Sequence, residues 1–173
     1  MSPDEIERAI ARMAHQIVEP ADVQTGLLLI GIRRGGEALA RRLASKINEI
    51  QGVPPQLGFL NINLYRDDDV ARELPESEIR TEITGKTVVI VDDVLYTGRT
   101  VRAALDAVTD LGRPKAIRLA VLIDRGLREL PVQGDYVGKL VPSSRREHID
   151  VKLSPQASEA DEVSLADEDR GTA

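Results

Sequence analysis

The sequence predicts an α/β fold with a mainly parallel sheet flanked by helices. Apolar segments of strand length alternate with helical segments along the chain, and this alternation is typical of parallel sheets. Residues 87–91 form a continuous β-branched run, which indicates a central strand buried on both faces. We therefore expect the functional loops where the strands reach their carboxyl ends.

The first predicted element is a helix that begins near Pro3. Ser2 suits the N-cap, Pro3 suits the first helical position, and Glu5 completes a capping box. Apolar residues that recur at helical spacing form one face, namely Ile6, Ile10, Met13 and Ile17. The opposite face carries Arg8, Arg12 and His15.

The remaining elements are expected in alternation. Strands are predicted at residues 27–30, 57–65, 87–91, 117–123, 136–140 and 149–153. In the second of these, one face carries Leu60, Ile62 and Leu64. One helix carries Leu39, Leu43 and Ile47, and another spans residues 100–111 and stops at Gly112. Residues 66–84 are polar and irregular, and they are expected to form a loop.

Composition excludes several classes of protein. The 173 residues contain no cysteine, which rules out thiol catalysis, thiolate metal sites and disulfides. The longest apolar runs are strand-sized, so no membrane span is expected. The N-terminus is acidic and has no apolar signal core, so a cytoplasmic protein is expected.

Charge divides the chain into two parts. The net charge is −6, and residues 155–173 hold six acids against one base. This tail has no aromatic residue and few large apolar ones, so it is predicted to be disordered, with one domain at residues 1–154. The balance argues against a broadly basic surface that coats nucleic acid, although a local basic patch stays open.

The segment at residues 88–100 carries the chemistry. A buried strand ends in Asp92 and Asp93, and a loop with Thr97, Gly98 and Thr100 then opens a helix. The first turn of a helix presents unpaired N–H groups that suit a phosphate. The carboxylates repel phosphate, but they can accept hydrogen bonds from sugar hydroxyls or face a hydrated metal. Phosphate beside a diol describes a ribose 5-phosphate.

Two other phosphate motifs are excluded. The segment lacks the Gly-x-x-x-x-Gly-Lys-Ser/Thr pattern of a Walker A loop, and it lacks the three spaced glycines of a dinucleotide fingerprint. The alternative is a strand–turn–helix in which Asp92 or Asp93 merely caps. A capping role alone could explain any one of these residues, but it explains the combination over residues 88–100 less well.

Four blocks of the chain resemble the PyrR family within the type I phosphoribosyltransferases. They span residues 12–15, 64–68, 92–103 and 119–139, the last including Asp124-Arg125-Gly126. The resemblance covers about residues 3–153. It implies a type I phosphoribosyltransferase fold and transfer of ribose 5-phosphate from phosphoribosyl pyrophosphate (PRPP) to uracil, which gives UMP and pyrophosphate.

The resemblance also implies a role for each site residue. Asp92 and Asp93 would hold the ribose hydroxyls and, with Arg34, serve catalysis. The 5-phosphate would lie on Tyr96, Thr97, Gly98, Arg99 and Thr100. Pyrophosphate, bridged by Mg²⁺ that is bound mainly through PRPP, would lie on Arg33, Arg34, Gly35 and Gly36. The base would lie near Asp124, Arg125 and Gly126, and residues 66–84 resemble the flexible loop that closes over such sites.

The chain departs from the family pattern at three places. The pyrophosphate loop usually reads Thr-Arg-Gly, whereas this chain has Arg34-Gly35-Gly36. Leu127 replaces a common histidine, and Gln133-Gly134 replaces a more usual Arg-Ala. Purine enzymes of this type carry an acid at the position of Tyr96, so tyrosine there favours a pyrimidine.

The family also binds the leader of pyr mRNA, with UMP or UTP strengthening the grip, and forms dimers or larger homo-oligomers. Cations that suit this second function are Arg12, His15, Arg145, Arg146, His148 and Lys152. The alternative is that these are ordinary solvated residues. Two other functions stay open, namely a nucleotide sensor with little catalysis and a phosphoribosyltransferase for another base.

Overall fold

The computed structural model describes residues 1–20, 23, 26–67 and 75–167. Five parallel strands form the main sheet in the order β2-β1-β3-β4-β5. Their bounds are Leu27–Ile32 for β1, Gln56–Leu60 for β2, Thr87–Leu95 for β3, Ala116–Asp124 for β4 and Tyr136–Leu140 for β5. The prediction of a mainly parallel sheet with residues 87–91 at its centre is confirmed.

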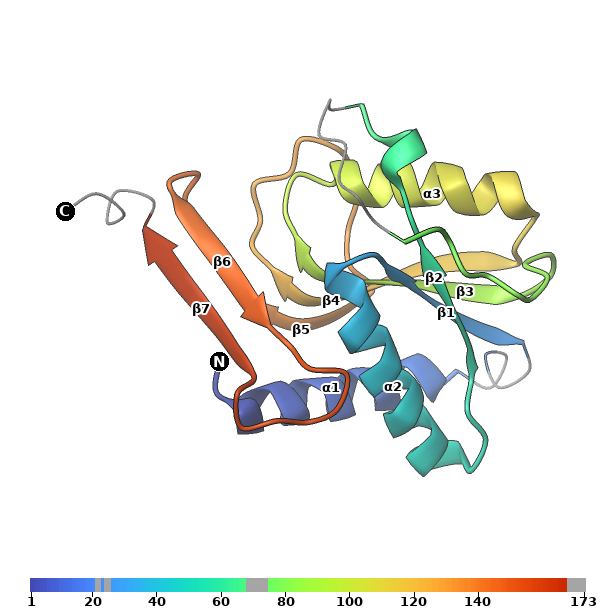
Figure 1. Ribbon diagram of the computed structural model, residues 1–173, viewed down its shortest axis with the longest axis horizontal. Coiled ribbons are helices and arrows are strands. Elements are labelled where there is room, and N and C mark those ends of the chain that lie inside the picture. Colours follow the sequence, from blue (N-terminus) through green and yellow to red (C-terminus); the bar gives the residue numbers. More distant parts are fainter. Residues whose placement is uncertain (21–22, 24–25, 68–74, 168–173) are drawn as a thin grey trace.

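Helices cover both faces of the sheet (Figure 1). Helix α1 (Pro3–Val18) and helix α2 (Gly35–Gln51) pack on one face, where Leu29 and Val89 belong to their core. Helix α3 (Arg99–Leu111) packs on the other face against Leu28 and Val88. Adjacent residues of a strand thus serve opposite cores, because side chains alternate across a sheet.

The start of α1 matches its prediction. The Ser2 hydroxyl accepts a hydrogen bond from the Glu5 amide, and the Glu5 carboxylate accepts one from the Ser2 amide at 2.7 Å. These two bonds form the expected capping box. The four apolar residues predicted to form one face are all buried. No helix in the described part of the chain is both long enough and apolar enough to cross a bilayer.

The prediction of one strand over residues 57–65 is wrong at its carboxyl end. Strand β2 ends at Leu60, and a short 3-10 helix, η2, follows at Asn63–Tyr65. The side-chain oxygen of Asn61 accepts a hydrogen bond from the Asn63 amide at 3.0 Å, which turns the chain out of the strand. Leu64 is therefore 94% exposed instead of sharing a buried face with Leu60.

The prediction of a disordered tail is wrong for residues 155–167. Strands β6 (Glu147–Lys152) and β7 (Glu162–Asp167) pair as an antiparallel hairpin across the expected boundary. Val163 of β7 is buried in the same core as α1 and α2, so this segment packs onto the domain. Residues 168–173 lie outside the described residues.

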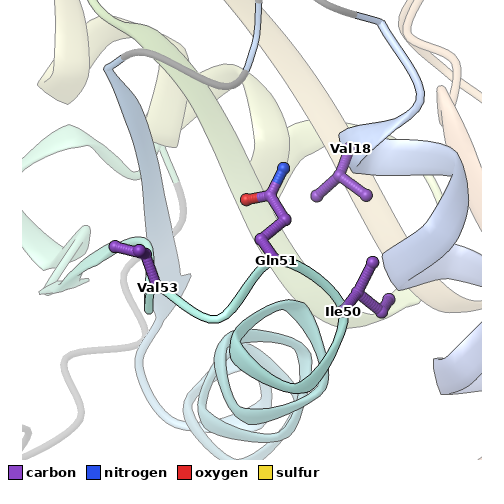
Figure 2. Close-up of a pocket in the computed structure, with 4 residues that line it drawn as sticks. All are labelled: Val18, Ile50, Gln51 and Val53. Carbon is purple, nitrogen blue, oxygen red and sulfur yellow. The ribbon is translucent and has the colours of Figure 1, made fainter.

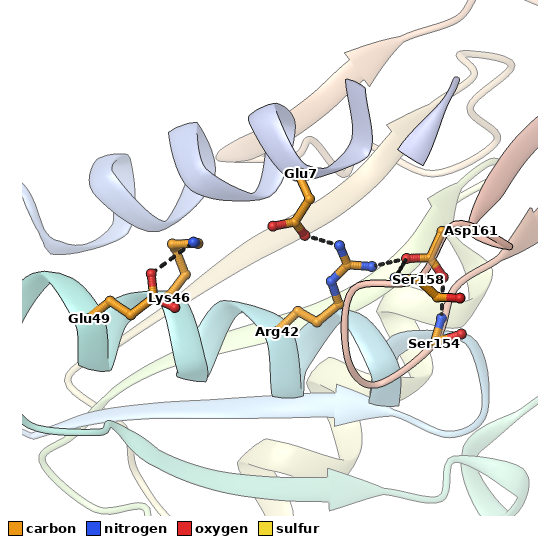
Figure 3. A network of polar contacts seen from close by, with 7 residues as sticks. All are labelled: Glu7, Arg42, Lys46, Glu49, Ser154, Ser158 and Asp161. Carbon is orange, nitrogen blue, oxygen red and sulfur yellow. Dashed lines mark hydrogen bonds and ion pairs between the residues drawn. The ribbon is translucent and has the colours of Figure 1, made fainter. Parts of the chain in front are cut away.

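An ion pair fixes the loop between β6 and β7 to the helices (Figure 3). Arg42 of α2 donates to Asp161 at 2.6 Å and also pairs with Glu7 of α1. Asp161 accepts two further hydrogen bonds, from the amides of Ser154 at 2.9 Å and Ser158 at 3.1 Å. The acidic composition suggested disorder, but this acid is neutralised in the fold.

Candidate active site

Asp92 and Asp93 lie near the carboxyl end of the central strand β3. Asp92 is buried and Asp93 is partly buried. The Asp92 carboxylate accepts a hydrogen bond from the Asp93 amide at 3.0 Å, and the Asp93 carboxylate accepts one from the Val94 amide at 2.7 Å. Neighbouring backbone groups thus fix the orientation of both carboxylates.

Burial makes these carboxylates hard to ionise. It raises the pKa of Asp92 well above its usual value, and the charge of Asp93 raises it further. Burial is also the main cause that raises the pKa of Asp93. Carboxylates held in this way gain from hydroxyl donors or a nearby cation, because either one stabilises the negative charge.

The loop at residues 33–36 lies directly against this acidic pair. A Cβ atom at Gly35 would lie 2.4 Å from the Asp93 carboxylate, which is closer than real Cβ contacts. Gly36 is buried beside it in the first turn of α2. Only a residue without a side chain allows this approach, so the predicted pyrophosphate loop and the two acids form one site.

The predicted phosphate loop opens α3 as expected. Gly98 is the N-cap with φ 93°, in the left-handed region that favours glycine. The Thr97 hydroxyl accepts a hydrogen bond from the Arg99 amide at 3.4 Å, and Thr100 lies in the first turn of the helix. The Arg99 side chain instead donates to Glu129 at 2.9 Å and Asp67 at 3.0 Å.

The two arginines of the pyrophosphate loop differ in their surroundings. Arg33 is ion-paired with Glu37, donates to the Glu76 carbonyl at 3.1 Å and lies over the Phe59 ring. Its side chain is only 9% exposed, so these contacts use it to hold the loop. Arg34 is exposed at the N-cap of α2 and is the better placed of the two to meet an anion.

The predicted base residues lie at the end of β4, next to β3. Asp124 accepts hydrogen bonds from the Gly126 amide at 3.0 Å and from Arg128 at 2.6 Å. Arg125 is buried, and its guanidinium lies over the Tyr96 ring. The polar groups of Asp124 and Arg125 are thus engaged within the protein, which leaves Gly126 and Leu127 as the more accessible positions.

Leu127 adopts a backbone conformation that is uncommon for leucine. Its φ is 61°, and it is the only non-glycine residue with positive φ among those that the structure describes. Histidine occurs in this region several times more readily than most residues. Histidine would therefore suit this turn better than leucine does.

Sequence reasoning missed two residues that organise the site. Arg128 donates to the Tyr96 carbonyl at 2.9 Å as well as to Asp124, and Glu129 holds Arg99. Both stand in a block that resembles the family. Nothing in their spacing shows which distant loop they contact, because that contact depends on β3 and β4 being neighbours.

The structure does not bring the predicted RNA-binding cations together. Arg12 and His15 are exposed on α1, whereas Arg145 and Arg146 lie in the turn before β6, at the end of the hairpin farther from α1 (Figure 1). Arg12 donates to the Val137 and Gly138 carbonyls. Lys152, the last of the predicted cations, is flanked by two acids, with Asp150 at 3.9 Å and Glu162 at 3.8 Å.

A separate pocket lies at the opposite edge of the sheet. Val18, Ile50, Gln51 and Val53 line it, at the ends of α1 and α2 and just before β2 (Figure 2). It therefore faces the amino ends of the strands. The acidic pair lies at their carboxyl ends, so this pocket is not part of the candidate site.

Comparisons with known proteins agree with this geometry. The family model for the phosphoribosyl transferase domain matches residues 2–156. A relative from Pelotomaculum thermopropionicum, "Bifunctional protein PyrR", is 54% identical, with 88% of this chain and 87% of the relative covered. One of the same name from Deinococcus radiodurans is 52% identical, with 88% and 86% covered. The chain belongs to the PyrR family. The resemblance read from its motifs is confirmed.

A solved structure supports the fold. Hypoxanthine phosphoribosyltransferase from Trypanosoma cruzi, in complex with the product IMP, matches with a TM-score of 0.67 and 24% identity. The match covers 83% of this chain and 76% of that chain. The prediction of a type I phosphoribosyltransferase fold is confirmed.

The residues at this site fit a magnesium ion that arrives with its substrate. The described residues include no group of three His, Cys, Asp or Glu side chains that could hold a metal on their own. Mg²⁺ commonly uses one or two carboxylates together with water and substrate phosphates. Asp92 and Asp93 supply that kind of donor set.

Proposed function

We propose that this chain transfers a phosphoribosyl group from PRPP to uracil and releases UMP and pyrophosphate. The observation that carries the proposal is the contact of the Gly35 backbone with the Asp93 carboxylate, beside the N-terminus of α3. Three groups that suit pyrophosphate, ribose and 5-phosphate thus meet at one edge of the sheet. The named relatives are called bifunctional. We also propose that the reaction takes place in the cytoplasm.

Each part of the site has a distinct task in this reaction. The amides at the start of α3 and the hydroxyls of Thr97 and Thr100 bind the 5-phosphate. Asp92 and Asp93 accept hydrogen bonds from the ribose hydroxyls and stabilise positive charge that develops on the sugar. Arg34 binds the departing pyrophosphate.

The protein needs no covalent nucleophile for this transfer. The bond from the anomeric carbon to pyrophosphate breaks, a bond to the uracil nitrogen forms, and the proton of that nitrogen passes to the released pyrophosphate or to water. Catalysis then consists of alignment and electrostatic stabilisation. Magnesium, when bound with PRPP near Asp92 and Asp93, would neutralise charge on the leaving group.

Uracil is favoured over a purine by Tyr96. This residue follows β3, and its ring lies against Arg125, whereas purine enzymes of this type carry an acid at that position. Residues 66–84 would close over the bound substrates. Of that segment, residues 68–74 lie outside the described residues.

We further propose that uridine nucleotides strengthen binding of a pyr mRNA leader and that the chain works as a homo-oligomer. Support comes from the family and from exposed cations on α1 and in the turn before β6. RNA binding relies on phosphate contacts. In a gel-shift assay, the affinity of the protein for the leader RNA is expected to increase when UMP is added. Weak binding that UMP does not change would count against this second function.

The enzymatic proposal is tested by a panel of bases with PRPP and Mg²⁺. Uracil is expected to turn over well ahead of orotate, hypoxanthine and guanine. Asp93→Asn should lower turnover by about 100-fold because it removes the ribose-facing charge. Asp106→Asn is a matched control, since Asp106 is half-exposed on α3, where it pairs with Arg102 of the same helix.

Three outcomes would contradict the proposal. Wild-type protein that turns over no pyrimidine is not a uracil phosphoribosyltransferase. Preferred turnover of hypoxanthine, guanine or orotate would establish a phosphoribosyltransferase for another base. UMP binding without any turnover would favour the nucleotide sensor.

A further inference from the structure

Two arginines from the end of β4 converge on Tyr96, the residue that leads into the phosphate loop. The Arg125 guanidinium lies over the Tyr96 ring, with its carbon 4.1 Å from the ring centroid. Arg128 donates to the Tyr96 backbone carbonyl at 2.9 Å. The side chain and the backbone of one residue are therefore held from the same neighbouring loop.

Arg128 also holds its own loop in shape. Its guanidinium donates to the Asp124 carboxylate at 2.6 Å, to the Val132 carbonyl at 2.9 Å and to the Gly126 carbonyl at 3.3 Å. A planar guanidinium with several donors can meet acceptors in such different directions at once. Loss of this side chain would free the loop and the Tyr96 carbonyl together.

Backbone contacts tie the same two loops more closely. The Thr97 carbonyl accepts hydrogen bonds from the amides of Glu129 at 2.9 Å and Leu130 at 3.1 Å. A Cβ atom at Gly98 would lie 2.3 Å from a methyl group of Val132. The loop after β4 therefore packs against the phosphate loop at Thr97 and Gly98.

Arg125 is anchored in a different direction. Its guanidinium donates to the Ser143 hydroxyl at 2.8 Å and to the carbonyls of Ser144 at 2.8 Å and Glu147 at 2.6 Å. These contacts join it to the start of β6. The buried guanidinium is thus a fixed platform for one face of the Tyr96 ring.

We propose that Arg125 and Arg128 are positioning residues that fix Tyr96, with different consequences for the two substrates. Arg128 sets the backbone of the phosphate loop and so controls recognition of the 5-phosphate. Arg125 sets the plane of the Tyr96 ring and so controls recognition of the base. The split between substrates rests on the function proposed above, whereas the hold on the phosphate loop does not.

The test of Arg128 compares two ligands that differ only in the phosphate. Calorimetric binding of UMP and of uridine is measured for the wild type, Arg128→Gln and Arg128→Lys. Arg128→Gln should weaken UMP by about tenfold while it changes uridine affinity little. Arg128→Lys should fall between, because lysine can keep the pair with Asp124 but not the other bonds.

The test of Arg125 uses steady-state kinetics. Arg125→Gln should raise KM for uracil by about tenfold and leave KM for PRPP nearly unchanged. Tyr96→Leu removes the stack and leaves every hydrogen bond of Arg125 in place, so it should give the same shift. The variant that combines Arg125→Gln with Tyr96→Leu should have nearly the same KM for uracil as either single variant, because each change removes the same interaction.

Arg118→Gln is the matched control for both arginines. Arg118 lies near the amino end of β4, its side chain is 52% exposed, and it has a 3.9 Å ion pair with Asp135. Its kinetics and binding should match the wild type. A thermal melt of each variant identifies any that fails to fold, in which case Arg128→Lys and Tyr96→Leu carry the test.

The possible results separate this inference from the proposed reaction. Equal weakening of UMP and uridine, or unchanged UMP affinity in folded Arg128 variants, would overturn the role of Arg128. A Tyr96→Leu enzyme with wild-type KM for uracil would overturn that of Arg125. Absence of turnover in the wild type would refute the reaction, and the comparison of UMP with uridine would still decide the hold on the phosphate loop.

Discussion

Replacing Gly35 with alanine should disable the site while it leaves the fold intact. The added Cβ would lie 2.4 Å from the Asp93 carboxylate, about 1 Å short of ordinary van der Waals contact. Either the loop or Asp93 must move by about that distance. A misplacement of about 1 Å at a reacting centre can cost about 100-fold in rate, so kcat/KM for PRPP should fall by about that factor.

The assay is PRPP-dependent turnover together with thermal unfolding. Gly35 lies in the first turn of α2, where alanine favours the helix, so the melting temperature should not fall much. Ser45→Ala is a matched control, because Ser45 is exposed farther along α2 and also gains helix propensity. A folded Gly35→Ala enzyme with wild-type kcat/KM would refute the idea that this contact aligns the loop at residues 33–36 with Asp93.

Three further changes should alter stability. Asp92→Asn should raise the melting temperature at pH 7 and lower turnover, because burial raises the pKa of Asp92 and makes its charge costly in the folded protein. The gain in melting temperature should shrink as the pH falls toward about 4, where Asp92 is protonated in the wild type as well. A variant that melts below the wild type at pH 7 would contradict this expectation. Asp161→Ala should cost about 3 kcal/mol, or about 6 to 12 °C in a melt, because it leaves buried Arg42 without its main partner. Hydrogen bonds and Arg42 keep the pKa of Asp161 below its usual value despite burial. The loss of unfolding free energy in Asp161→Ala, measured by denaturant titration, should therefore shrink as the pH falls from 7 to about 3. A loss that stays constant over this range would show that the charge of Asp161 is not its cause. Ser2→Ala should cost about 1 kcal/mol through the lost cap, against no loss in Ser45→Ala.

Local patterns predicted the main elements well. The β-branched run became the central strand, and the cap at Ser2 formed as expected. The sequence also placed the acidic pair and the phosphate loop at one edge of the sheet. These predictions held because strand and helix preferences depend on neighbouring residues along the chain.

Predictions failed where a contact from elsewhere outweighed composition. Residues 155–167 look like an acidic tail, yet Arg42 neutralises Asp161 and Val163 enters the core. The structure also shows partners that composition could not identify, since acidic, carbonyl and aromatic groups hold Arg33 and Arg125 within the protein. Composition shows the charge of a residue but does not identify its partner.

The sequence by itself determined the fold class, the family and the chemical types of group at the site. Those features follow from hydrophobic period, turn residues and a short motif, all of which are local. Only the tertiary structure decided that Gly35 meets Asp93 and that two arginines meet at Tyr96. The order of the strands sets these contacts, since it brings together loops that are far apart along the chain.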